Sequence, residues 1–207
     1  VKVATAGSGS SANNYDGPIY IDDFIWYDTP APGDNHGFEI EPIAWYSGGG
    51  DCLSVERSAD RATNGSYSLK MNYNLQYPGE GFTQWDVGNT NLSGKTINVY
   101  FYAPAAGAGN CTRPNGVSIF AKDTSDRWAN GHFNKIVDYV GTCIHHEDSW
   151  WQITWNIDTD TGGGCYKQSG FDSSHIKQVG IKISTPGNGT SAVNDYNGPY
   201  YIDDFTW

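Results

Sequence analysis

The sequence predicts an all-β fold, either a β-sandwich or a barrel. Short runs of β-branched and aromatic residues alternate with turn residues along the chain, which is typical of sandwiches and barrels. Glycine occurs 26 times, and aromatic residues make up 14% of the 207 residues. The sequence has no long stretches of Ala, Leu, Glu and Lys, from which helices are commonly built. This length suits one large β domain or two small domains.

The first residues of the chain copy its last residues. Gly17–Trp26 reads GPIYIDDFIW, and Gly198–Trp207 reads GPYYIDDFTW. Val1–Thr5 in turn resembles Ile181–Thr185, so residues 1–26 correspond to the final two predicted strands. Such self-similarity indicates a tandem array, and we interpret 1–26 as a remnant resembling the last two strands of a preceding module. Surplus strands seek a sheet edge, so we expect the remnant to dock on this chain or, by strand exchange, on a neighbour.

Two further segments follow the remnant. Residues 27–36 contain Pro and Gly, and we interpret them as a linker. Residues 37–207 form the complete module, a β-sandwich that already has its own closing strand. Within this module, β-rich runs bounded by turn residues predict strands near 52–57, 66–73, 81–87, 95–102, 116–122, 133–140, 150–157, 177–184 and 200–206.

The charge of the chain limits its partners. The formal net charge is −11 at pH 7, which argues against nucleic acid, because nucleic-acid binding needs a basic patch. No apolar run approaches the length of a membrane span, so no membrane partner is expected. Neutral sugars or cations suit an acidic protein better, although the charge can also serve solubility alone.

Four cysteines, Cys52, Cys111, Cys143 and Cys165, indicate two disulfides. They form no Cys-x-x-Cys pair, and no Cys/His spacing fits a zinc motif. An even number of cysteines in a glycine-rich β chain is typical of an oxidising compartment, so we expect an extracellular protein. Counting strands up and down the sandwich predicts a Cys111–Cys143 bridge and leaves Cys52–Cys165. A Cys143–Cys165 bridge is the alternative.

Four segments in this order resemble a known family. They are GFE at 37–39, RATNGSYSLKMNY at 61–73, SWWQITWNI at 149–157 and GPYYIDDFTW at 198–207. Together they resemble the β-jelly-roll carbohydrate-binding modules that are attached to extracellular glycoside hydrolases of bacteria. The resemblance covers residues 37–207. It implies a jelly-roll sandwich of two antiparallel sheets, a structural calcium ion, non-catalytic glycan binding, and a catalytic domain elsewhere in the parent chain.

The closing strand carries two adjacent carboxylates, Asp203 and Asp204, on opposite faces. The inward one needs a partner, because a buried unpaired carboxylate is costly. Calcium is a suitable partner, since it takes hard oxygen ligands that include backbone carbonyls. The resemblance implies that Glu39 lies beside Asp203, with carbonyls from the turn around Asn64 and Ser66. A hydrogen-bonded structural aspartate is the alternative.

The parity of four predicted strands selects the candidate sugar-binding side chains. Successive residues of a strand point to opposite faces, and the apolar positions take the core face. The opposite positions mix aromatic rings with amides and amines. This mixture suits sugars, because rings stack on their C–H faces and amides bind their hydroxyls. The candidates are Asn98, Tyr100, Tyr102, Phe120, Trp150, Gln152 and Lys182, with Trp85, Trp45 and Tyr46 next.

Two conditions apply to this predicted site. The four strands must lie in one sheet, and Trp150 rather than Trp151 must face outward. One alternative is a flipped strand with Trp151 exposed. The other is a face that long loops cover, so that its aromatic residues form a second, minor core.

The predicted function is non-catalytic binding of a neutral β-linked polysaccharide such as mannan, glucan or xylan, which would target an attached hydrolase. A jelly-roll hydrolase or lyase is the first rival. Glycosidases use two positioned carboxylates, and Glu39 and Glu41 form the most evident pair on one strand face, but the pattern Glu-x-Asp-x-x-Glu is absent. The cluster HHED at 145–148 fits a polar turn better than a metal or catalytic site. A structural or adhesive repeat is the second rival.

Overall fold

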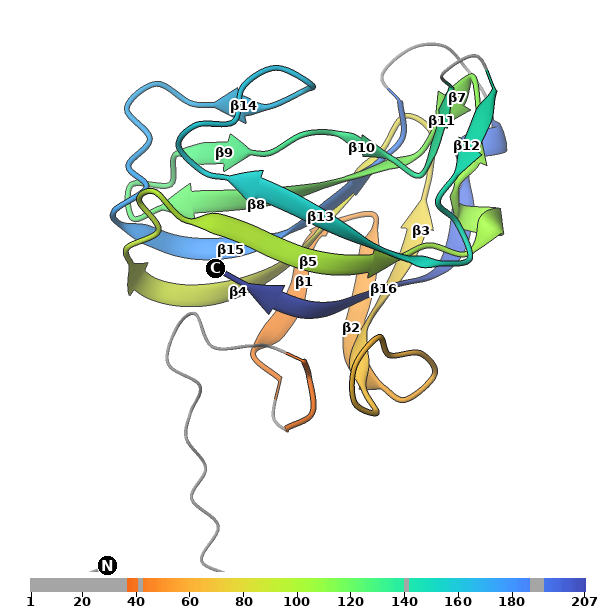
Figure 1. The fold of residues 1–207 in the computed structure, drawn as a ribbon, viewed down its shortest axis with the longest axis horizontal. Helices are drawn as coiled ribbons and strands as arrows, with labels where there is room; N and C mark the ends of the chain where they lie inside the picture. Colours follow the sequence, from red (N-terminus) through yellow and green to blue (C-terminus); the bar gives the residue numbers. More distant parts are fainter. Residues whose placement is uncertain (1–36, 41–42, 140–141, 187–191) are drawn as a thin grey trace, which may run out of the picture.

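The computed structural model describes residues 37–40, 43–139, 142–186 and 192–207. The predicted remnant 1–26 and linker 27–36 lie outside these ranges. Within them the chain forms a sandwich of two antiparallel sheets, as predicted (Figure 1). None of the helices in these four ranges is long and apolar enough to cross a membrane.

The sandwich is built from a seven-stranded and a five-stranded sheet. The larger sheet has the order β1 (Trp45–Gly50), β4 (Glu80–Thr90), β15 (Ile176–Ser184), β8 (Gly116–Asp123), β9 (Trp128–Asn130) and β14 (Tyr166–Lys167), with β10 (Asn134–Lys135) beside β8. The smaller sheet has the order β13 (Trp150–Asn156), β5 (Thr96–Tyr102), β16 (Tyr196–Thr206), β3 (Ser68–Leu75) and β2 (Cys52–Ser58).

Two short ribbons and two helical turns complete the described fold. The ribbons are β6 (Gly109–Asn110) with β7 (Arg113–Pro114), and β11 (Val137–Tyr139) with β12 (Cys143–His145). The 3-10 turns are η2 (Ala105–Gly107) and η3 (Ala192–Asn194). The single strand predicted at 133–140 is therefore divided into β10 and β11, which belong to different sheets. Between them, the Ile136 N–H bonds to the Asn115 carbonyl at 2.9 Å and not to a partner in either ladder.

Strand alternation determines which side chains fill the space between the sheets. Val99 and Phe101 of β5 are fully buried, and the register places Val99 opposite Ile153 of β13, so these two share the core face. Trp151 packs edge-on against Phe101 with ring centroids 5.0 Å apart. Trp151 therefore faces the core and Trp150 faces outward, which confirms the parity predicted for this strand.

One predicted disulfide is present. Cys111, between β6 and β7, is bonded to Cys143 at the start of β12, and the two Cα atoms are 5.8 Å apart. The bond ties the two short ribbons together at one corner of the sandwich (upper right in Figure 1). This bond also excludes the alternative Cys143–Cys165 bridge.

The predicted Cys52–Cys165 bridge is wrong, because both cysteines are free thiols. Cys52 is buried, with Sγ 3.3 Å from Thr83 Oγ1 of β4. Cys165 precedes β14, at the far edge of the larger sheet from β1 and β4. Counting strands up and down the sandwich predicts at which end of the sandwich a residue lies. It does not predict which strands lie side by side in a sheet, and Cys52, on β2, and Cys165, just before β14, lie far apart.

Reduction of the Cys111–Cys143 bond is expected to destabilise the fold. The bond joins residues 32 positions apart, and losing such a constraint on the unfolded chain costs about 3–4 kcal/mol at 25 °C. Thermal unfolding with and without a phosphine reductant, with the same metal chelator in both samples, measures the loss. Cys165→Ser is the matched control, because it removes a thiol and leaves the bond intact. Equal melting temperatures for the oxidised and the reduced protein would contradict this expectation.

Candidate functional site

The predicted sugar-binding residues lie on two opposite faces of the sandwich. The outer face of the five-stranded sheet carries Asn98, Tyr100, Tyr102, Trp150 and Gln152, and that of the seven-stranded sheet carries Phe120 and Lys182. The four strands therefore do not share a sheet, and the predicted set is wrong as a single site. Alternation assigns a side chain to a face of its strand but does not say to which sheet the strand belongs.

A continuous row of paired residues crosses the outer face of the seven-stranded sheet. Directly opposite residues of neighbouring antiparallel strands share a face. Figure 1 shows these strands following one another from β4 to β14. Neighbouring strands of a sheet lie about 4.8 Å apart, so a row that crosses six strands is about 24 Å long. The row consists of Tyr46, Gln84, Gly180, Phe120, Asn130 and Tyr166.

Two parallel rows flank this one on the same face. We call the surface formed by all three rows the seven-strand face. The flanking rows are Asp86, Gln178, Lys122 and Trp128 on one side, and Phe82, Lys182 and Ser118 on the other. Aromatic rings, amides, amines and hydroxyls thus come together from six strands.

Three aromatic rings form the middle of the seven-strand face. Trp128 stacks on Phe120 with ring centroids 4.3 Å apart and 15° between the planes. Phe82 meets both rings edge-on, at 5.9 and 5.6 Å. Phe120 is fully buried in this cluster, so its predicted sugar contact is wrong, and it instead supports the partly exposed Trp128. Gly180 permits this packing, because a Cβ there would lie 2.6 Å from the Phe120 ring.

Tyr46, Asp86 and Gln178 form a hydrogen-bonded cluster at the β1 end of the face. Tyr46 Oη donates to Asp86 Oδ1 at 2.7 Å. The Gln178 amide donates to the same carboxylate oxygen at 2.6 Å and to Tyr46 Oη at 3.0 Å. Burial, together with the hydrogen bond to Asp86, raises the pKa of Tyr46 above its usual value of 10.0. The hydroxyl therefore stays protonated at neutral pH.

A pocket of about 460 Å³ opens near the β14 end of the face. Ser118, Asn130 and Lys182 contribute polar groups to its lining, and Tyr166 contributes a ring that is 56% exposed. Lys182 Nζ lies 3.5 Å from the Glu80 carboxylate, so its charge is compensated. The pocket therefore offers neutral hydrogen-bonding groups and a paired amine beside an exposed ring.

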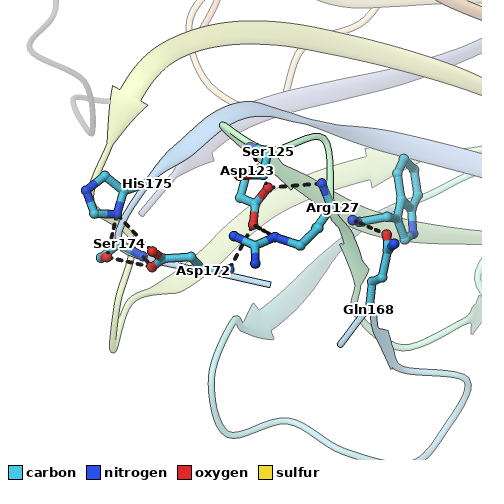
Figure 2. A network of polar contacts seen from close by, with 8 residues as sticks. Asp123, Ser125, Arg127, Gln168, Asp172, Ser174 and His175 are labelled. Atoms are coloured by element: carbon cyan, nitrogen blue, oxygen red, sulfur yellow. Dashed lines mark hydrogen bonds and ion pairs between the residues drawn. The ribbon is translucent and has the colours of Figure 1, made fainter. Parts of the chain in front are cut away.

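A buried carboxylate holds the turn that precedes Trp128 (Figure 2). Asp123, the last residue of β8, accepts hydrogen bonds from the backbone N–H groups of Ser125, Arg127 and Asp172 at 2.9, 3.0 and 3.0 Å. Arg127 Nε adds a charged hydrogen bond at 2.6 Å. Burial raises the pKa of Asp123, but these hydrogen bonds outweigh burial and lower it below 3.8. The network joins the β8–β9 turn to the segment that follows β14.

Trp128 is fixed by two further hydrogen bonds. Its backbone N–H donates to Gln168 Oε1 at 3.1 Å (Figure 2), and its indole Nε1–H donates to Asn130 Oδ1 at 3.0 Å. A side chain that is already ordered loses little entropy when a ligand binds. The ring of Trp128 is therefore held in one orientation on the seven-strand face.

Ser174, His175 and Asp172 lie close together at the same edge but do not form a catalytic triad (Figure 2). In a triad, the histidine uses one ring nitrogen for the nucleophile and the other for the carboxylate. Here Ser174 Oγ and Asp172 Oδ2 both contact Nδ1 of His175, at 2.9 and 3.0 Å. The group instead stabilises the turn before β15.

The carboxylates of β4 are too far apart for glycoside hydrolysis. Glu80 and Asp86 lie six residues apart on this strand, a distance of about 20 Å at about 3.4 Å per residue. Glycosidases need two carboxyl groups about 5–9.5 Å apart. Of the pair named from the sequence, Glu39 lies away from the seven-strand face, and Glu41 lies outside the described residues.

The outer face of the five-stranded sheet is partly covered by its own side chains. Arg61 lies over the Tyr102 ring at 4.1 Å, and Tyr102 is only 4% exposed, so its predicted sugar contact is wrong. Trp150 leans on Tyr102 with ring centroids 5.6 Å apart. Trp150 and Tyr100 are partly exposed, so sugar contact on this face would depend on these two rings.

Trp45 and Trp85, named as further binding residues, belong to the core side of β1 and β4. They lie opposite each other in the register, and Trp45 is 6% exposed. Trp45 packs edge-on against Phe205 at 5.0 Å, and Trp85 contacts Trp207 at 5.3 Å. Trp45 is therefore buried in the core and Trp85 is partly buried against it, whereas Tyr46, the next residue after Trp45, lies on the seven-strand face.

Glu39 binds the turn that was predicted to supply calcium-binding carbonyls. Its Oε1 accepts hydrogen bonds from the backbone N–H groups of Ser66 and Tyr67 at 3.0 and 2.9 Å. Gly65 adopts φ +69°, and a Cβ there would lie 2.4 Å from Glu39 Oε1. Glycine therefore allows this close approach between the turn and the carboxylate.

Asp203 binds the same turn from β16. It is fully buried, and its Oδ2 accepts hydrogen bonds from the backbone N–H groups of Thr63 and Asn64 at 2.8 and 3.3 Å. Burial raises the pKa of Asp203 to about 6, even though these hydrogen bonds act in the opposite direction. The Asn64 amide also contacts the neighbouring Asp204 carboxylate. These hard oxygen atoms suit calcium, and a cation would neutralise the buried carboxylate.

Comparison with known proteins gives similarity in fold at low sequence identity. No sequence profile of a protein family and no curated protein sequence matches the chain. The C-terminal family 22 carbohydrate-binding module of Clostridium thermocellum Xyn10B shares 14% identity at a TM-score of 0.47, over 86% of this chain and 93% of that one. The family 11 module from Clostridium thermocellum, solved with a β-1,3-1,4-mixed-linked tetrasaccharide, shares 13% identity at a TM-score of 0.48. This match covers 84% of this chain and 95% of that one.

One of the similar structures is a tandem of two modules. The CBM22-1–CBM22-2 tandem from Paenibacillus barcinonensis Xyn10C shares 15% identity at a TM-score of 0.43, and the match covers 86% of this chain and 46% of the tandem. The chain is thus similar in fold to these solved carbohydrate-binding modules, and its ligand and site residues follow only from its own side chains.

Proposed function

We propose that the seven-strand face binds a neutral β-linked polysaccharide without cleaving it. The observation that carries this proposal is the row from Tyr46 to Tyr166, about 24 Å long, which has exposed rings at both ends and is flanked by the partly exposed Gln178, Lys122 and Trp128. Sugar rings present apolar C–H faces edged by hydroxyls, so a surface of this composition is complementary to them. The extended shape suits a chain of sugars better than a single one.

The charges of the chain support a neutral ligand. The formal net charge of −11 would repel a polyanion over the molecule as a whole. On the seven-strand face, Lys182 is paired with Glu80, and Asp86 accepts hydrogen bonds from neutral groups. Hydroxyl groups can bond to all of these side chains without requiring a new ion pair.

Binding and cleavage can be separated by two measurements on the same mixtures. Calorimetry with soluble mannan, mixed-linkage glucan and xylan reports binding, and assays for new reducing or unsaturated chain ends report cleavage. We expect saturable binding to one of these polysaccharides without new chain ends. New chain ends would favour the hydrolase or lyase, and absence of binding to all three would favour a structural or adhesive repeat.

The proposal extends to the setting of the module. We propose an extracellular module that keeps an attached catalytic domain on its polysaccharide, in a chain with a further tandem module. The Cys111–Cys143 disulfide supports an oxidising environment, and the copied segment 1–26 supports the tandem arrangement.

We also propose one structural calcium ion at Glu39 and Asp203, with carbonyls from the turn around Asn64 and Ser66. Support comes from the two carboxylates that hold one turn, from the oxygen-only donor set, and from the burial of Asp203. Bound calcium would supply positive charge at a buried carboxylate and would link β16 to the turn between β2 and β3.

Chelation is expected to lower the melting temperature. A ligand that binds only the folded state at 100 times its Kd stabilises the protein by about 2.7 kcal/mol. Scanning calorimetry with excess calcium and with excess chelator measures the difference, and Glu39→Gln is expected to reduce it. Glu56→Gln, on an exposed side chain of β2 paired with Lys70, is the matched control. An unchanged melting temperature after chelation, with no calcium found by elemental analysis, would rule the ion out.

A further inference from the structure

The disulfide corner contains a second group of metal-binding atoms. Sγ of Cys111, Sγ of Cys143 and a ring nitrogen of His145 all lie within 4.8 Å of one another. The three side chains line one pocket of about 360 Å³. Because Cys111 and Cys143 are 32 positions apart, the sequence shows no zinc spacing here, and only the fold brings the atoms together.

Glu147 adds a fourth functional group to this pocket. Its Oε1 contacts His145 Nδ1, an arrangement that orients the ring and leaves Nε2 for a metal. Its Oε2 is buried and has no hydrogen-bond partner among the described residues. Buried polar atoms nearly always have partners, so such an atom requires an explanation such as a water molecule or an ion. A metal-bound water in the pocket would donate to Oε2.

We propose that this corner binds one Zn²⁺ when Cys111 and Cys143 are reduced. Two thiolates and His145 Nε2 supply three ligands, and water takes the fourth position of the tetrahedron. The two thiolates balance the charge of the ion. The zinc site and the disulfide use the same sulfur atoms, so each state excludes the other.

The two states are related by a two-electron step. A dithiol reductant gives two electrons and two protons to the S–S bond and is itself oxidised to a disulfide, so that two thiols form on the protein. Zn²⁺ then displaces the two thiol protons, because the thiolate is the ligand. In the reverse direction, a disulfide-containing oxidant takes up the two electrons from the thiolates and two protons from water and becomes a dithiol, the S–S bond forms, and Zn²⁺ leaves.

Both states join the same two ribbons. The disulfide links the β6–β7 ribbon to the β11–β12 ribbon, and zinc would join the same residues. A chain that folds before its disulfide forms would therefore keep this corner closed. The site lies on the short ribbons and shares no residue with the seven-strand face, so the proposal stands independently of polysaccharide binding.

Cobalt is the probe that tests the proposal, because thiolate-to-Co²⁺ charge-transfer absorption in the near ultraviolet reports sulfur ligation directly. The full chain, reduced with a phosphine, is expected to show this band with one equivalent of Co²⁺, and equimolar Zn²⁺ should remove it. The oxidised chain should show no band. His145→Ala should weaken Co²⁺ binding by about 10-fold or more. His175→Ala is the matched control, because His175 is similarly exposed but lies at another edge.

The two free cysteines require their own control. The band should persist in Cys165→Ser and disappear in Cys111→Ser, and Zn²⁺ should raise the melting temperature of the reduced chain but not that of Cys111→Ser. If reduction loosens the fold, Zn²⁺ is expected to restore the circular dichroism of the native chain. Titration of all four thiols shows that the chain is fully reduced. If the fully reduced chain shows no charge-transfer band with Co²⁺, the proposal is overturned. A band that survives Cys111→Ser also overturns it.

Discussion

Replacing Trp128 by Ala is expected to lower the affinity for the polysaccharide by about 5- to 150-fold, which corresponds to about 1–3 kcal/mol. The indole is partly exposed on the seven-strand face and stacks on Phe120. Hydrogen bonds to Gln168 and Asn130 hold it in place. A large ring that is already ordered gives much of its contact energy to binding. Calorimetry with the polysaccharide that binds wild type measures the change.

Trp150→Ala is the matched control for this prediction. Trp150 is also a partly exposed tryptophan, but it lies on the opposite face of the sandwich. We expect this variant to keep full affinity. Trp128→Phe keeps a ring against Phe120 and should lose less affinity than Trp128→Ala. Because this variant preserves the ring packing, it separates a lost sugar contact from a disrupted fold. Lost affinity in Trp150→Ala with full affinity in Trp128→Ala would move the site to the five-stranded sheet.

Strand parity could be predicted from the sequence because one face of each strand is buried. The apolar positions of β5 and β13 alternate, and the structure buries Val99, Phe101, Ile153 and Trp155 as expected. Sheet membership could not be predicted in the same way. It depends on pairing between distant segments, such as β8 with β15, and local alternation contains no information about those partners.

Trp128, the aromatic residue proposed here for sugar contact, was missed because its strand is too short. β9 has three residues and β14 has two, so neither shows an alternating pattern. Trp128 and Tyr166 therefore gave no signal by parity. The strand β4 was predicted, but Trp85, on its core side, was named as the candidate residue. Phe82 and Asp86, which lie on its outer face, were not named.

The convergence of Glu39 with Asp203 was predicted only by the family resemblance. The two carboxylates lie at opposite ends of the module in sequence, and both bind the turn at residues 63–67. No periodicity relates them. The bridge between Cys111 and Cys143 was found by counting strands, which succeeded because both cysteines lie in connections at the same corner.

Asp123→Ala is expected to cause the largest loss of stability, about 3–5 kcal/mol, because the buried carboxylate accepts three backbone hydrogen bonds as well as the charged one from the partly exposed Arg127. The variant leaves the Arg127 guanidinium without this carboxylate and removes the acceptor for three backbone N–H groups. Urea unfolding at pH 7 measures the loss. Asp126→Asn is the matched control in the same turn. Its ion pair with Lys177 is exposed, so we expect a change of at most about 1 kcal/mol.

The contribution of Asp123 has a defined pH dependence. Its folded-state pKa lies below the usual value of 3.8, because backbone N–H groups and Arg127 stabilise the carboxylate more strongly than burial disfavours it. The unfolded state therefore binds the proton more tightly, and stability falls as protons are added. The stabilisation is complete above about pH 3.8 and is lost as the pH falls through the folded-state pKa. Asp123→Asn should be less stable than wild type at pH 7, and the two unfolding free energies should converge below pH 4. Parallel pH profiles for the two proteins would show that this carboxylate is not the group that titrates.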